Sequence, residues 1–217
     1  MTAALELPPR MRRLPLDHVG RPIPWFVHID DQGVPDFRVV RPRGIEDAFR
    51  FGQCWICGLP RGRAAAFVIG PMCAVNRVSA EPPSHLDCAL YAARACPFLT
   101  RPAMRRRTSN LPDDRIDPAG EMIARNPGVT LVWQSKTWKP FAVPQEHGGG
   151  VLFDVGEPLA VSWLAEGRTA TRAEVLASID SGLPSLREMA EADRRPAAAL
   201  AELERQHDRA LDLVPTG

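Results

Sequence analysis

The sequence predicts an α+β protein with β-hairpins in its first two thirds and a helical final third. Three observations support this prediction. Short β-prone apolar runs, separated by turn residues, recur between residues 21 and 155. Residues 171–217 instead carry a helix-capping pattern and are rich in Ala and Glu. Within the first of these regions, residues 53–96 contain two closely spaced pairs of metal-ligating residue types.

The composition is that of an ordinary globular chain, with 217 residues, 45% of them hydrophobic and 24% charged. No apolar run approaches the roughly 18 residues of a membrane-spanning helix. Pro and Arg interrupt residues 1–20, where a signal peptide needs an apolar run. We therefore expect a cytoplasmic protein without membrane contact. Its five cysteines should stay reduced, which favours metal binding or core packing over disulfides.

Changes in composition divide the chain into four regions. Residues 1–20 are expected to be a flexible N-terminal arm, and residues 21–100 a β-hairpin plus a metal-binding unit. Residues 101–126 are polar and rich in turn residues, as in a linker or loop. Residues 127–217 are expected to form a β-hairpin and helical region, either separate from the preceding domain or continuous with it.

The first predicted elements are a hairpin and a short helix. Residues 23–29 and 37–40 are apolar, and residues 30–33 between them have the composition of a hairpin loop. A helix is expected near residues 45–51. Residues 64–69 and 73–79 then read as a second hairpin, joined by a Gly-Pro-Met turn.

A helix is predicted over residues 85–96, because Ser84 and Asp87 match the capping-box spacing and Pro97 ends the pattern. Further on, residues 129–133 and 137–143 suggest a third hairpin, followed by a strand over residues 151–155.

The final third reads as helical. Thr171 and Glu174 form a second capping box, and Gly182 is placed as the C-cap of that helix. Another helix is expected from Pro184, and a last one over residues 196–213.

Two residue pairs predict a metal site. Cys54 and Cys57 are separated by two residues and followed by glycine, so the backbone can turn both sulfurs toward one ion. His85 and Cys88 would lie on one face in the first turn of the predicted helix, where the helix dipole favours a thiolate. The interpretation we favour is a structural Zn²⁺ held by these four residues.

The order of a CxxC turn, a predicted hairpin and a helix carrying the last two ligands resembles the treble-clef zinc modules. The resemblance covers residues 54–96, and it implies that Cys54 and Cys57 form the zinc knuckle while His85 and Cys88 come from the helix start. Treble clefs bind nucleic acid, dock proteins or cut nucleic acid, so the resemblance implies a scaffold and no single activity. Residues 70–77 also resemble an uncharacterised family of bacteria and phages.

Alternatives remain for the ligand set and for the metal. Cys73 could replace His85 as the fourth ligand. Cys96, followed by proline, keeps an iron–sulfur cluster open, although about 12 Å of helix would separate it from Cys88. Packing or redox roles for the cysteines are a third possibility.

Four protein ligands would close the site to catalysis, and the phosphate-loop, dinucleotide, serine-hydrolase and HExxH motifs are absent from the sequence. The main hypothesis is therefore a zinc-stabilised binding protein, which favours a non-enzymatic role and leaves an enzymatic one open. The alternative is a metal-dependent hydrolase that uses an open zinc position near Glu81 or Cys73.

Charge is unevenly distributed along the chain. Residues 38–112 carry twelve arginines and four acidic residues, a net charge of +8, whereas residues 113–217 have a net charge of −6. Arginine binds phosphate bidentately, so a nucleic-acid surface is predicted after the zinc helix. Its candidate residues are Arg94, Arg101, Arg105, Arg106 and Arg107. The other expected partner is a protein, bound through this basic region or through the acidic helical end. Alternatively, the arginines belong to a solvated charged loop that binds no partner.

Overall fold

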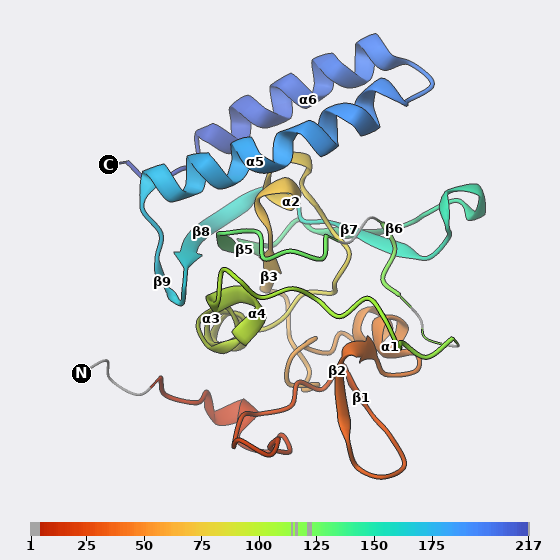
Figure 1. Cartoon of the computed structure of the whole chain (residues 1–217), viewed down its shortest axis with the longest axis vertical. Coiled ribbons are helices and arrows are strands. Elements are labelled where there is room, and N and C mark those ends of the chain that lie inside the picture. The colour runs from red at the N-terminus through yellow and green to blue at the C-terminus, as the bar shows by residue number, and fades with distance from the viewer. Residues whose placement is uncertain (1–4, 114, 116, 121–122, 217) are drawn as a thin grey trace.

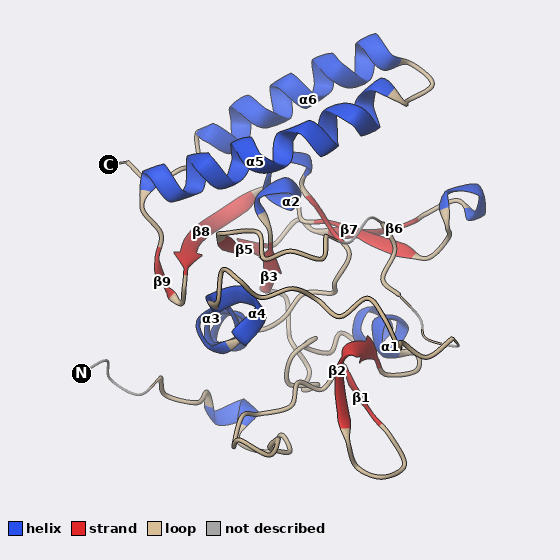
Figure 2. Ribbon diagram, in the orientation of Figure 1, coloured by secondary structure: helices blue, strands red, loops and turns tan. Residues whose placement is uncertain are grey.

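The molecule is built in layers, shown in Figures 1 and 2. The computed structural model describes residues 5–113, 115, 117–120 and 123–216; parts of the predicted arm and linker therefore lie outside the described residues. Helices α5 and α6 form one outer layer, and a four-stranded sheet lies beneath them. Helix α3 packs on the other side of that sheet, and the N-terminal residues lie farthest from α5 and α6. Both helices and antiparallel sheets are present, as the predicted α+β class requires.

The N-terminal part begins with the 3₁₀ turn η1 (Pro9–Met11). Strands β1 (Val27–Ile29) and β2 (Pro35–Val40) pair antiparallel, which confirms the first predicted hairpin. Helix α1 (Gly44–Arg50) follows, as the sequence predicts.

The main sheet has the strand order β3-β5-β8-β9 and is antiparallel throughout. Its strands are β3 (Ala65–Ile69), β5 (Thr130–Ser135), β8 (Pro158–Ala165) and β9 (Arg168–Thr169). Trp133 in β5 is fully buried between the sheet and the helices. Because β3 pairs with β5, residues 65–69 share a sheet with strands that follow residue 127.

A second sheet has the order β4-β7-β6. It contains β4 (Val78–Ser79), β6 (Lys139–Ala142) and β7 (Val151–Asp154), and the turn η2 (Gln145–His147) lies between the last two. The strand predicted over residues 151–155 is thus confirmed.

Two predicted hairpins are wrong. Gly70 caps helix α2 (Pro71–Asn76), and Pro71 occupies its first turn, where a missing N–H costs nothing. The residues expected as the second strand therefore form a helix and then β4, which pairs with β7. Strand β5 likewise pairs with β3 and β8, and β6 pairs with β7, so the third predicted hairpin does not form.

Helix α3 (Leu86–Ala95) is confirmed, and α4 (Pro97–Thr100) continues after a break at Cys96. The capping box predicted at its start is wrong. His85 is the N-cap residue without a side-chain capping bond, because Ser84 instead pairs through its backbone with Ala66 in β3.

Helices α5 (Arg172–Glu191) and α6 (Pro196–Leu211) pack against each other. Thr171 and Glu174 form the predicted capping box. The predicted break is wrong, since α5 runs through both Gly182 and Pro184. Gly182 is buried and approaches Met72 of α2 so closely that a side chain would overlap it. Packing against α2, not chain termination, therefore accounts for this glycine.

None of the described helices is both long and apolar enough to span a membrane.

Candidate metal centre

The first pair of ligands lies on a tight loop. The Cys54 N–H donates to the Leu59 carbonyl, and the Gly58 N–H donates to the Cys54 carbonyl, at 2.8 Å each. Gly58 has φ +71, a left-handed conformation that glycine adopts without strain. A Cβ atom there would also overlap the Trp25 indole ring, which packs directly on the loop. These contacts fold residues 54–59 so that both cysteine side chains are fully buried.

The second pair lies at the start of α3. The backbone pairing of Ser84 with Ala66 holds His85 beside the loop, 31 residues after Cys54. Cys88 is in the first turn of the helix and fully buried. An extended residue followed by the helix thus turns the His85 and Cys88 side chains toward the same point.

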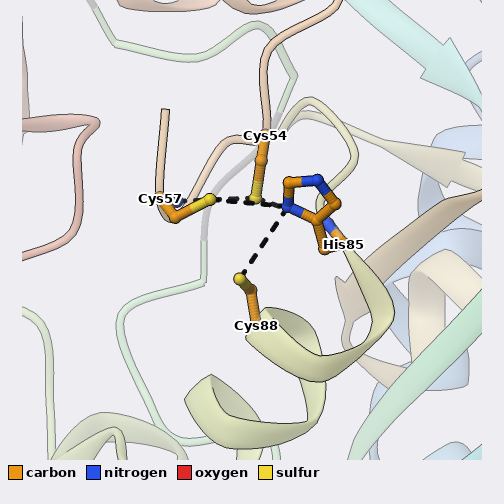
Figure 3. Close-up of side chains that lie close together, drawn as sticks. All are labelled: Cys54, Cys57, His85 and Cys88. Carbon is orange, nitrogen blue, oxygen red and sulfur yellow. Dashed lines mark hydrogen bonds between the residues drawn. The ribbon is translucent and has the colours of Figure 1, made fainter. Parts of the chain in front are cut away.

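The four side chains converge, as Figure 3 shows. The sulfurs of Cys54, Cys57 and Cys88 and a ring nitrogen of His85 all lie within 4.8 Å of one another. His85 Nδ1 is 3.4 Å from the Cys57 sulfur and 3.9 Å from the Cys88 sulfur. In a tetrahedral zinc site the separation of sulfur and nitrogen ligands is about 3.5 Å and that of two sulfurs about 3.8 Å. The cluster could therefore hold one metal ion.

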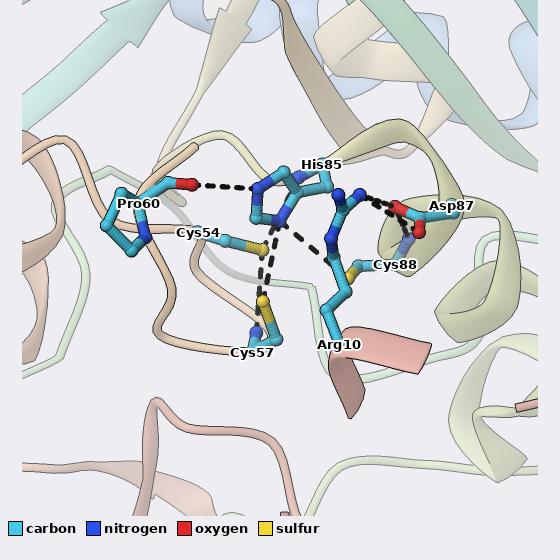
Figure 4. Close-up of polar contacts among 7 residues, drawn as sticks. All are labelled: Arg10, Cys54, Cys57, Pro60, His85, Asp87 and Cys88. Carbon is cyan, nitrogen blue, oxygen red and sulfur yellow. Dashed lines mark hydrogen bonds and ion pairs between the residues drawn. The ribbon is translucent and has the colours of Figure 1, made fainter. Parts of the chain in front are cut away.

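The environment of His85 selects the nitrogen that faces the sulfurs. Its Nε2 is 3.0 Å from the Pro60 carbonyl, which can only accept a hydrogen bond (Figure 4). Nε2 must therefore carry the proton, and the lone pair is on Nδ1. A histidine whose second nitrogen donates to a carbonyl is oriented for metal ligation, because this bond fixes both ring and tautomer.

The sulfurs share a strongly coupled electrostatic environment. The pKa of Cys54 is lowered by hydrogen bonds from the Cys57 and Cys88 thiols and from the backbone N–H groups of Cys57 and His85. The pKa values of Cys57 and Cys88 are raised, chiefly because each thiol donates to Cys54. All three sulfurs can ionise together only when a cation offsets their repulsion.

The N-terminal residues cover one side of the cluster. Met11 and Leu14 are buried against the cysteines. Beside them Arg10 Nη1 donates to both carboxylate oxygens of Asp87, at 2.9 and 3.0 Å, and this ion pair joins η1 to the first turn of α3 (Figure 4). Asp87 also accepts from the Cys88 N–H, so the same carboxylate contacts the ligand-bearing turn.

The chain matches no protein-family model, and no curated protein or solved structure is significantly similar to it. Any functional inference therefore depends on the four donor side chains and their geometry. The treble-clef resemblance remains a prediction, because the chain between the two ligand pairs forms β3, α2 and β4 in place of a hairpin.

The other candidate residues lie outside this cluster. Cys73 is in α2 and Cys96 is the C-cap residue of α3, so the cluster contains His85 and neither of these cysteines. Glu81 is not among the four ligands either, and burial raises the pKa of its carboxyl group. Trp55 is buried and stacks on Phe26 at 4.7 Å, which leaves no face for a nucleic-acid base.

The five predicted nucleic-acid-binding arginines differ in their surroundings. Arg94, Arg101 and Arg105 are exposed, and the described residues include no acidic partner for them. Arg106 is half-buried over the Phe98 ring, at 4.6 Å. Arg107 forms an ion pair with Asp36 in β2. Three of the five side chains are thus exposed and form no ion pair within the part of the chain that the structure describes.

The residues that support the four side chains of the cluster have no recognisable pattern in the sequence. Arg10 is 77 residues from Asp87, and the acceptor for His85 is a backbone carbonyl, which has no residue signature. The short spacing of each ligand pair was visible in the sequence, but these long-range supports were not.

Proposed function

We propose that the chain is a binding protein whose N-terminal half is stabilised by one structural zinc ion. The convergence of three cysteine sulfurs and His85 Nδ1 is the observation that supports this proposal. Three thiolates and one imidazole form a donor set typical of structural zinc. Four protein ligands leave no position for a reactive water, so the ion would serve folding and not catalysis.

The zinc assignment predicts one zinc per purified chain, and an X-ray absorption spectrum with three sulfur neighbours, one nitrogen and no water oxygen. The variant C54S should lose the metal. The variants C73S and C96S are matched controls, because these two cysteines are outside the cluster, and each should keep a full equivalent of zinc. Iron and inorganic sulfide in the purified protein would contradict the zinc assignment and indicate an iron–sulfur cluster. A bound water oxygen would instead support the hydrolase alternative.

The proposed partner is nucleic acid, contacted through the basic region that begins on α3. The supporting observations are the net charge of +8 over residues 38–112 and the exposure of Arg94, Arg101 and Arg105. Arg106 and Arg107 complete the proposed surface, although their internal contacts suit them to shaping it. Binding that depends on phosphate contacts should weaken steeply as salt increases.

Fluorescence anisotropy with single-stranded and duplex probes at two salt concentrations tests this surface. We expect salt-sensitive binding by the native protein, and at least tenfold weaker binding by R94Q/R101Q/R105Q. The control R187Q/R194Q/R195Q removes equal charge from exposed positions on α5 and just beyond it. Absence of salt-sensitive binding to every probe would leave a protein partner as the proposal, to be tested by pull-down with the full-length chain.

A further inference from the structure

We propose that a second site, in a cavity next to the metal-binding loop, binds the phosphate group of a small phosphate ester. The cavity is lined by Arg61, Gly62, Arg63, Lys136 and Trp138 and has a volume of about 430 Å³. We call it the arginine pocket. Its size is within the range of small-molecule sites, roughly 300–1,000 Å³. The proposal goes beyond the proposed function, because none of these residues belongs to the metal cluster or to the surface around α3.

Arg61 is the residue that points to an anionic ligand. It exposes only 9% of its surface, and its Nε has no hydrogen-bond partner. Its Nη1 donates to the carbonyls of Gly62 and Ala64, and no acidic side chain pairs with it in the described chain. Buried arginines are normally paired with an anion, since desolvating a charge is costly. A bound oxyanion beside the guanidinium would offset the charge that the described acidic side chains leave unpaired.

The remaining lining favours phosphate over a carboxylate. Arg63 and Lys136 are exposed, so three cationic groups and no acidic group line the arginine pocket. A phosphate monoester carries close to two negative charges at neutral pH, whereas a carboxylate carries one. Guanidinium groups also match phosphate oxygens bidentately.

The scaffold holds the two sides of the pocket in place. The Arg61 N–H donates to the Gly52 carbonyl at 2.8 Å, which fixes the chain directly after the metal-binding loop. The Arg61 guanidinium lies 4.8 Å from the centre of the Trp138 ring, a cation–π contact that orients it. Lys136 and Trp138 flank Thr137, whose N–H donates to the Ser135 hydroxyl and whose own hydroxyl accepts from the Glu157 backbone N–H. These contacts position the backbone on both sides of the pocket and the Arg61 guanidinium before a ligand arrives.

Isothermal titration calorimetry of the full chain tests the proposal, with a 5′-nucleoside monophosphate, the same nucleoside without phosphate, and inorganic phosphate as titrants. We expect the monophosphate to bind and the nucleoside not to bind. Arg61 is buried, and its replacement risks misfolding, so the test variant is R63Q/K136Q, which changes exposed residues only. This variant should bind the monophosphate at least tenfold more weakly.

Two controls separate this site from the rest of the molecule. R187Q/R194Q removes the same charge from a distant exposed surface and should change the affinity less than twofold. R94Q/R101Q/R105Q should also keep the affinity, even if it abolishes nucleic-acid binding. Failure of the native protein to bind the monophosphate, binding of inorganic phosphate alone, or an unchanged affinity in R63Q/K136Q would overturn the proposal.

Discussion

Single residues at the candidate metal centre have distinct roles that the number of possible ligands does not describe. His85 presents Nδ1 because the Pro60 carbonyl binds the proton on Nε2. Cys54 accepts backbone hydrogen bonds from both sides of the cluster, at 3.4 and 3.3 Å. Gly58 allows the loop to turn and leaves room for Trp25. Each of these contacts positions a ligand before any ion binds.

Gly58→Ala should destabilise the protein more than Gly52→Ala. Both glycines have positive φ, +71 and +62, so each substitution incurs the strain of a left-handed residue, about 1–2 kcal/mol. A methyl group at position 52 meets no atom within 4 Å, whereas at position 58 it overlaps Trp25. Overpacking adds about 1–3 kcal/mol. Urea unfolding of both variants measures the difference in their free energies of unfolding. Equal losses of stability would show that the Trp25 side chain moves away from the added methyl group at no measurable cost.

Glu174 should make stability depend on pH in the acid range. The ion pair with Arg168, helped by hydrogen bonds from Thr171, lowers the pKa of Glu174 from 4.5 to about 2. Because the folded-state pKa is the lower one, the stabilisation is complete above pH 4.5 and is lost as the pH falls toward 2. Glu174→Gln should therefore cost stability at pH 6 and little at pH 2.

Melting temperatures of E174Q and the native protein across that pH range test this. Glu188→Gln is the control, since Glu188 is exposed on the same helix and has no charged partner among the described residues. A gap between E174Q and the native protein that stays constant with pH would contradict the assignment.

At the scale of elements, local signals were predictable from the sequence and pairing was not. The Thr171–Glu174 capping box and the short hairpin of β1 and β2 depend on neighbouring residues, and both form as predicted. In the sheet, β5 lies between β3 and β8. The strand β3 is far from β5 in the sequence, so no local signal indicates that the two pair. Nothing in residues 130–135 states which strands they join.

The same contrast between local signals and long-range contacts applies to Gly70-Pro71, to strands β8 and β9, and to the candidate metal site. The Gly70-Pro71 pair is compatible with both a turn and the start of a helix. The helix forms here because α2 packs against α5 and α6. Strands β8 and β9 were not predicted, although Gly156 and Gly167 mark turns before and after β8. Residues 158–165 are mostly apolar without strict alternation, so their pattern does not distinguish a strand from a helix. The close spacing within each pair predicted that Cys54, Cys57, His85 and Cys88 would form a cluster, whereas the contacts of Arg10 and Arg61 became visible only in three dimensions.

Pro184→Ala should stabilise helix α5. Pro184 is exposed and lies at the thirteenth residue of the helix, where it lacks the N–H that would bond to the carbonyl four residues earlier. Proline in a helix interior costs about 3 kcal/mol relative to alanine, offset by up to about 1 kcal/mol of lost flexibility in the unfolded chain. A rise in melting temperature is expected. The substitution Ser185→Ala, at the adjacent exposed position, should leave the melting temperature nearly unchanged. A lower melting temperature in P184A would contradict the prediction that Pro184 destabilises the helix.

At the scale of the whole molecule, the metal cluster and the main core are separate. The large core contains Trp133, Phe153 and Ile179 between the main sheet and the helical layer, and none of the metal ligands is in it. The cluster has its own apolar shell, formed by Met11, Leu14 and neighbouring side chains. Helix α3 connects the two, because it carries Cys88 and packs on β3 and β5.

Removal of the proposed zinc should therefore unfold the molecule in part. With a strong chelator, we expect amide hydrogen exchange to accelerate in residues 7–25, in residues 53–61 and in the first turn of α3. Exchange in β5 and in the middle of α5 should stay slow, since their core does not depend on the ion. Uniform acceleration over all elements would show one cooperative unit instead.

The Arg10–Asp87 bridge has a consequence for kinetics. Residues 10–14 act as a latch across one side of the sulfurs, so a competing chelator gains access from that side only after this short segment has lifted. Affinity and residence time of the ion would then be governed by different parts of the chain. The four proposed ligands would set the equilibrium, and the opening frequency of the Arg10–Asp87 ion pair would set the rate of metal release.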